Sequence, residues 1–137
     1  MKLGVLVEAG EETRVAIVPN SVPKLMKLGF EVLVESGAGV SAHHLDAEYE
    51  AKGASIVGRD DAMACEMLIC IGAPDFSALS EGQMVACVSD PFRHPERVKQ
   101  AMDAKVTLMS MDMIPRRLSR AQAMDVNSSQ DNLAGYK

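Results

Sequence analysis

The sequence predicts an α/β fold in which a parallel β-sheet is covered by helices on both faces. Short apolar runs recur along the chain, and stretches whose apolar residues follow helical spacing separate them. These runs are apolar nearly throughout rather than alternating, which is typical of parallel strands buried on both sides. Because no internal repeat or linker interrupts the pattern, we expect one compact α/β unit followed by a last helix.

Each element is predicted from its own residues. The first helix has Asn20 or Ser21 as its cap and Gly29 as its stop, and Pro95 suits the first turn of a later helix. The predicted strands span residues 2–7, 30–34, 55–57, 67–71, 84–88 and 105–111, and the predicted helices span 19–28, 46–52 and 95–104, with another from about residue 119.

Composition narrows the class of protein. The chain has 137 residues, of which 47% are apolar and 24% charged, as in ordinary globular proteins. Its net charge of −5 argues against nucleic-acid binding, and no apolar run is long enough to span a bilayer. The early carboxylate Glu8 argues against a signal peptide. Cys65, Cys70 and Cys87, an odd number in or beside apolar segments, indicate buried, reduced thiols.

The last stretch carries a polar pattern. Ser119 and Gln122 have the spacing of a capping box, so a helix is expected to begin near Ser119. On a continuous helix, polar side chains would share one face; they are Gln122, Asp125, Ser128 or Ser129, and Asn132. Such a face suits either a packed polar seam or a stripe that contacts a polar ligand, and residue types alone leave both open.

Gly37-Ala38-Gly39 follows a predicted strand and matches part of a dinucleotide fingerprint. That fingerprint requires a helix to open directly after the glycines, whereas the next N-cap is expected only at Asp46. A carboxylate for the ribose is also poorly placed, because Asp60 lies beyond a glycine turn. A simple glycine turn is therefore the favoured interpretation.

Two groups of histidines are candidates for a chemical role. The cluster His43, His44, Asp46 and Glu48 fits no standard metal-ligand spacing and indicates a solvated loop. His94 follows a strand and could act as an acid or base, but the prolines on both sides favour a rigid loop.

Arg14 lies just after the first predicted strand, at the edge where α/β sheets bind ligands. Its guanidinium could hold a carboxylate or phosphate, or it could pair with Glu8 or Glu12 and brace the loop. The residues alone favour neither role.

Several motifs carry a family resemblance. They are Glu12-x-Arg14-Val15-Ala16-x-x-Pro19, Glu35-x-Gly37-Ala38-Gly39, Ala51-x-Gly53-Ala54, Met109-x-Met111-Asp112-x-Ile114-Pro115, Arg117-Leu118-Ser119-Arg120-Ala121-Gln122-x-Met124-Asp125 and Ser128-Ser129-Gln130-x-Asn132-Leu133-Ala134-Gly135-Tyr136-Lys137. Together they resemble the N-terminal domain shared by alanine dehydrogenases and the alpha subunit of proton-translocating NAD(P) transhydrogenase. The stretch from Met109 onward resembles the transhydrogenase subunit most closely.

The resemblance implies a three-layer flavodoxin-like (Rossmann-like) domain at residues 1–115. Residues 116–137 would begin a connecting helix to an NAD-binding Rossmann domain absent from this chain. The cofactor would be NAD, with Arg117, Gln122, Asp125 and Ser128 near it; Arg116 is an extra arginine that could replace Arg117. Hydride transfer between two nicotinamides needs positioning rather than an acid or base.

The implied activity is hydride transfer between NAD(H) and NADP(H), coupled to proton translocation through NADP-binding and membrane components. The protein would be cytoplasmic, peripheral to the inner membrane, and a homodimer, and this chain alone would be inactive. One alternative is a non-catalytic module that pairs with a separate Rossmann half. The other is an alanine dehydrogenase, which would need a lysine in residues 67–72 and a histidine just after 84–88; the first is missing and His94 is misplaced.

Overall fold

The computed structural model describes residues 1–115, 117 and 119–135. Its centre is one sheet of six strands in the order β3-β2-β1-β4-β5-β6, and every neighbouring pair is parallel. The strands are β1 (Lys2–Val5), β2 (Glu31–Glu35), β3 (Ser55–Val57), β4 (Met67–Gly72), β5 (Met84–Val88) and β6 (Thr107–Ser110). The predicted parallel sheet is thus confirmed, with the Rossmann strand order.

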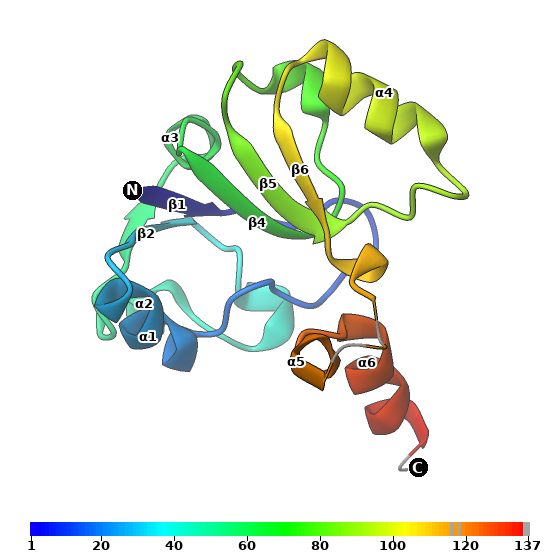
Figure 1. Cartoon of the computed structure of the whole chain (residues 1–137). Coiled ribbons are helices and arrows are strands. Elements are labelled where there is room, and N and C mark those ends of the chain that lie inside the picture. Colours follow the sequence, from blue (N-terminus) through cyan, green and yellow to red (C-terminus); the bar gives the residue numbers. More distant parts are fainter. Residues whose placement is uncertain (116, 118, 136–137) are drawn as a thin grey trace.

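Helices cover both faces of this sheet (Figure 1). The α-helices are α1 (Val22–Lys27), α2 (Asp46–Glu50), α3 (Arg59–Met63), α4 (Pro95–Asp103), α5 (Ser119–Gln122) and α6 (Val126–Gly135). Short 3-10 turns occur at η1 (Pro19–Ser21), η2 (Val40–Ala42), η3 (Phe76–Ala78) and η4 (Met111–Met113). Within the described part of the chain, no helix is long and apolar enough to cross a membrane.

Two apolar layers hold the sheet between its helices. On one face, Val22 of α1 and Tyr49 of α2 pack with Val34 and its neighbours on β1 and β2. On the other face, Ala62 of α3 and Ala101 of α4 pack with the strands β1, β2, β4 and β5. Because both faces are covered, the strands have no solvated side, which explains their nearly continuous apolar sequences.

Helix α3 is an element that the sequence pattern did not reveal. It has only five residues, too few to show a helical period, and Asp60 lies inside it rather than in a simple turn. Its close approach to β1 depends on Gly4, because a Cβ at that position would clash with the backbone oxygen of Ala62. The cap of α2 also differs slightly from expectation, since Leu45 is its N-cap and Asp46 its first residue.

The strand order brings the ends of β1 and β4 together in the middle of the sheet. We call the side of the sheet where the strands end the carboxyl edge; it is formed by Glu8, Glu35, Gly72, Ser89 and Asp112. In open α/β sheets, ligands bind at this edge, where the order of the strands reverses. The reversal here lies between β1 and β4.

Candidate functional site

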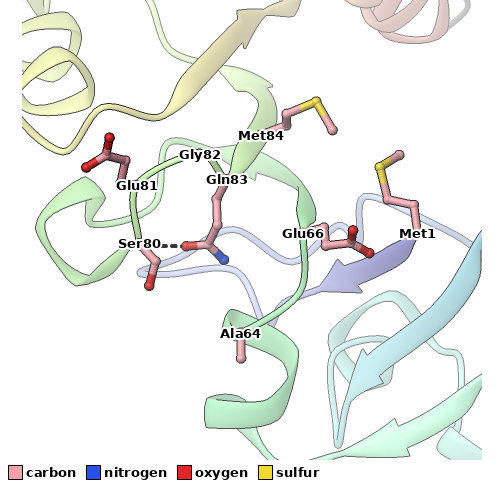
Figure 2. A pocket seen from close by; sticks show the side chains of 8 residues that line it. All are labelled: Met1, Ala64, Glu66, Ser80, Glu81, Gly82, Gln83 and Met84. Atoms are coloured by element: carbon pink, nitrogen blue, oxygen red, sulfur yellow. Dashed lines mark hydrogen bonds between the residues drawn. The ribbon is translucent and has the colours of Figure 1, made fainter.

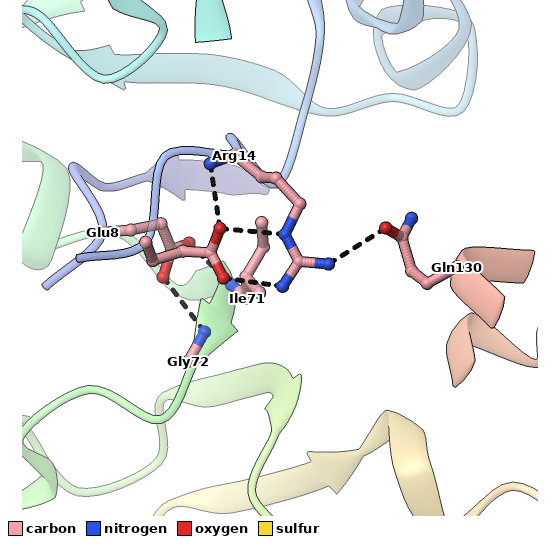
Figure 3. Close-up of polar contacts among 6 residues, drawn as sticks. Glu8, Arg14, Ile71, Gly72 and Gln130 are labelled. Carbon is pink, nitrogen blue, oxygen red and sulfur yellow. Dashed lines mark hydrogen bonds and ion pairs between the residues drawn. The ribbon is translucent and has the colours of Figure 1, made fainter. Parts of the chain in front are cut away.

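Glu8 links the two central strands at the carboxyl edge (Figure 3). Its carboxylate accepts hydrogen bonds from the backbone N–H groups of Ile71 at 2.6 Å and Gly72 at 3.0 Å. Two further carboxylates act in the same way beside it. Glu35 accepts from Val7 N at 2.8 Å, and Asp112 accepts from Ser89 N and Asp90 N. These acidic side chains therefore close backbone N–H groups that strand pairing leaves free.

Arg14 lies in the loop after β1 and faces two partners (Figure 3). Its Nε and Nη2 donate to the two carboxylate oxygens of Glu12 at 2.8 and 2.6 Å. Its Nη1 donates to Oε1 of Gln130 in α6 at 3.0 Å. The bond to Arg14 lowers the pKa of the Glu12 carboxyl to about 2, and Glu12 in turn raises the pKa of Arg14.

Of the two roles open to Arg14, the structure contains the brace. The bidentate pair with Glu12 uses two guanidinium nitrogens, and Gln130 occupies the third direction. The side chain of Arg14 is still 50% exposed, so solvent and small anions can reach it. The brace and an anion contact are therefore compatible at this residue.

The prediction of one continuous helix from about residue 119 is wrong. The structure contains α5 and α6, which are separated at residues 123–125. The break follows from Asp125, whose carboxylate accepts from the backbone N–H groups of Asn127 and Ser128, both at 3.1 Å. Asp125 thereby caps α6, and a capping side chain competes with continuation of the preceding helix.

The structure brings two of the expected cofactor residues together. Asp125 is buried, and its Oδ2 accepts a hydrogen bond from the hydroxyl of Ser128 at 2.6 Å. Arg117 is exposed in a turn before α5. Gln122 ends α5, but its side chain lies outside the description, and Arg116 lies outside the described residues altogether.

The other candidate motifs fold as structural features. Gly37 has φ of 84° and donates its N–H to Oδ1 of Asp46 at 2.9 Å. The glycines therefore form a turn ahead of α2, as the late N-cap indicated, and the Gly37 N–H is occupied. Among the described residues no group of His, Cys, Asp or Glu could hold a metal ion. His94 contacts Glu96 at 2.9 Å at the start of α4.

Two open hollows lie on the surface. One, at the opposite edge of the sheet from Glu8, is shaped by Gln83, which accepts from Ser80 N and donates to the backbone oxygens of Met63 and Cys65 (Figure 2). These bonds join loops and leave the hollow without a free buried polar group; none occurs among the described residues. The other hollow adjoins the carboxyl edge, between Asp112, Phe92 and Asn127 of α6.

Sequence reasoning missed the partners that complete this edge. Gln130 belongs to a motif that gave it no role, and 116 positions separate it from Arg14. The sequence suggested Glu8 only as a partner of Arg14, whereas it binds the end of β4. No local pattern signals either contact, because both depend on how distant segments pack.

The fold and the sequence match known proteins. The chain is 38% identical over 137 residues to the first portion of the NAD(P) transhydrogenase subunit alpha of Rhodospirillum rubrum, covering 92% of this chain and 35% of that protein. The crystal structure of transhydrogenase from Sinorhizobium meliloti superposes with a TM-score of 0.94 at 37% identity, covering 99% of this chain and 42% of that one. A solved L-alanine dehydrogenase gives a TM-score of 0.81 at 26% identity, covering 88% of this chain and 34% of that one.

The chain thus spans about a third of the length of the curated relative from Rhodospirillum rubrum. Residues 4–134, nearly the whole chain, match the family described as Alanine dehydrogenase/PNT, N-terminal domain. The six-stranded parallel sheet in Rossmann order agrees with that assignment. This chain therefore belongs to the alanine dehydrogenase/PNT N-terminal domain family.

Proposed function

We propose that the chain is the N-terminal domain of the alpha subunit of a proton-translocating NAD(P) transhydrogenase. In the complete protein it takes part in hydride transfer between NAD(H) and NADP(H), coupled to proton movement. The observation that carries this proposal is the likeness to the solved transhydrogenase, which covers 99% of the chain with a TM-score of 0.94. The likeness to the solved alanine dehydrogenase covers 88%, with a TM-score of 0.81.

The residues of the last segment suit a nicotinamide. The nicotinamide ring carries a carboxamide, which both donates and accepts hydrogen bonds, and NAD supplies the hydride acceptor. In our proposal Arg117, Gln122, Asp125 and Ser128 hold that end of the cofactor. Asp125 fits this role because it fixes the Ser128 hydroxyl at 2.6 Å, so that the hydroxyl oxygen has a set direction. A guanidinium, an amide and a hydroxyl position a ring without exchanging protons with it.

The proposal also defines partners and location. The NAD site would be completed by a Rossmann domain outside this chain, and a second component would carry NADP(H). A membrane component would conduct the protons, so the domain would lie in the cytoplasm, peripheral to the inner membrane. We also propose a homodimer.

The test measures hydride transfer by the complete protein. Reduction of an NAD analogue by NADPH is followed in the unsubstituted protein and in two variants. Ser128→Ala removes the hydroxyl that Asp125 orients, whereas Ser129→Ala removes a neighbouring hydroxyl that donates only to the Asp125 backbone oxygen. We expect Ser128→Ala to slow transfer about tenfold, as the loss of one positioning hydrogen bond does, and Ser129→Ala to leave it within a factor of about two.

Other results would replace the proposal. NAD reduction that depends on alanine, without transfer from NADPH, would assign the protein to amino-acid oxidation. Absence of both reactions in the complete protein would support a non-catalytic pairing module. Calorimetric titration of this chain alone with NADH adds a separate check: the missing Rossmann half predicts no binding in the micromolar range.

A further inference from the structure

We propose that Glu12, Arg14 and Gln130 form a latch by which the loop after β1 holds helix α6 over the carboxyl edge of the sheet. The latch joins the first loop of the domain to its last helix. Its three side chains form one continuous set of hydrogen bonds (Figure 3). In this arrangement Glu12 and Arg14 are positioning residues for α6.

One half of the latch fixes the direction of the guanidinium. Glu12 binds both Nε and Nη2 of Arg14, and the same carboxylate accepts the backbone N–H of Arg14 at 2.9 Å. A bidentate pair of this kind sets the plane of the guanidinium as well as its distance. The remaining nitrogen, Nη1, is thereby turned toward α6. Glu12 thus acts on α6 although it does not touch it.

The other half of the latch is the bond from Nη1 to Gln130. Gln130 is exposed, so its amide would be solvated if Arg14 were absent. Among the described side chains of α6, Gln130 alone has a hydrogen bond to a residue of 1–115. The bond therefore supplies orientation rather than burial.

Helix α6 depends on such a contact because little of it is buried. The buried residues of the last segment are Ala121 and Asp125, both before α6 begins. The described side chains of α6 itself are half-buried or exposed. A helix of ten residues with so little apolar contact has low stability of its own. A single hydrogen bond to a charged group is then a large part of what keeps it in place.

Hydrogen–deuterium exchange of the 137-residue chain tests the latch. Gln130→Met keeps the length of the side chain and removes the acceptor, while Gln130→Glu keeps an acceptor and adds an attractive charge. Gln100→Met on α4 is the matched control, because Gln100 is also an exposed helical glutamine. Glu12→Gln tests the remote half of the latch.

We expect the α6 amides to exchange about threefold faster in Gln130→Met and about twofold faster in Glu12→Gln, and no faster than in the unsubstituted chain in Gln130→Glu. Gln100→Met should leave α6 unchanged. Equal α6 exchange in the two methionine variants would overturn the latch, as would α6 amides that already lack protection in the unsubstituted chain. Faster α6 exchange in Gln130→Glu would do the same.

A second measurement rests on the proposed function. If α6 carries the nicotinamide-facing residues, Gln130→Met in the complete protein should slow hydride transfer and Gln130→Glu should restore it. The two ideas fail separately. Loss of the latch appears as unchanged exchange in this chain, whereas failure of the proposed function appears as no transfer by the unsubstituted complete protein.

Discussion

Glu8 binds the backbone of Gly72 across the centre of the sheet, with 3.0 Å between its Oε2 and the nitrogen of Gly72. Its other oxygen accepts from Ile71, so one side chain after β1 ends β4 as well. The register between β4 and β5 shifts at this point, between Ile69 and Gly72. The carboxylate therefore closes N–H groups where strand pairing becomes irregular.

Glu8→Gln should destabilise the chain. An amide has one accepting oxygen, so its NH2 group would face one of the two N–H donors and leave it without a partner. We expect a loss of about 1–3 kcal/mol in the free energy of unfolding, measured by urea titration. Glu11→Gln removes the same charge at an exposed neighbouring residue and should change it by less than about 0.5 kcal/mol. Equal effects of the two substitutions would mean that charge, not the bonds to β4, is responsible.

Gly4→Ala should move helix α3 away from β1. The added Cβ would meet the Ala62 backbone oxygen and, at 2.8 Å, Cδ2 of Leu68, and the backbone cannot yield cheaply. We expect a loss of about 1–3 kcal/mol in unfolding free energy, the usual cost of overpacking. Gly58→Ala is the control, because nothing lies within 4 Å of a Cβ there. A Gly4→Ala chain as stable as Gly58→Ala would contradict the close packing of α3.

Tyr49 should make the chain sensitive to alkali. Burial raises the pKa of Tyr49 to about 12, and its hydroxyl donates to the backbone oxygen of Ile17 at 2.9 Å. Since the folded pKa lies above the usual value of about 10, this contribution to stability is complete below about pH 10 and is lost as pH rises toward 12.

Chemical unfolding at increasing pH, followed by circular dichroism, checks the behaviour of Tyr49. Tyr49→Phe should be less stable at neutral pH, because the carbonyl of Ile17 loses its donor. It should also show a smaller fall in stability between about pH 10 and 12. A slope unchanged by the substitution would assign the alkaline sensitivity to other groups.

The three cysteines should react slowly with thiol reagents. All three are free and buried, and burial raises the pKa of both Cys70 and Cys87 to about 12. Because the thiolate is the reactive form, labelling requires that the chain open first. Mass spectrometry of alkylated protein should show almost no labelling in buffer and three labels in urea. Rapid labelling of Cys70 in buffer would show that β4 is more open than its 7% exposure indicates.

Most of the sheet could be predicted from local sequence. Strands β3 and β5 lie at the predicted residues 55–57 and 84–88, because each is an apolar run between turn or helix residues. Helix α3 was missed because five residues do not display a period. The break between α5 and α6 was missed because the side chain of Asp125 favours the cap over a continuous helix, a choice that spacing does not reveal.

The sequence by itself determined the parallel α/β class, the glycine turn before α2 and the burial of the three cysteines, because each depends on hydrophobic pattern or backbone freedom within a short stretch. Only the tertiary structure decided which groups meet at the carboxyl edge. Glu8 reaches Gly72, and Arg14 reaches Gln130, across separations of 64 and 116 positions. Such contacts follow from the order of strands and the path of the last helix, which packing of the whole chain sets rather than any local pattern.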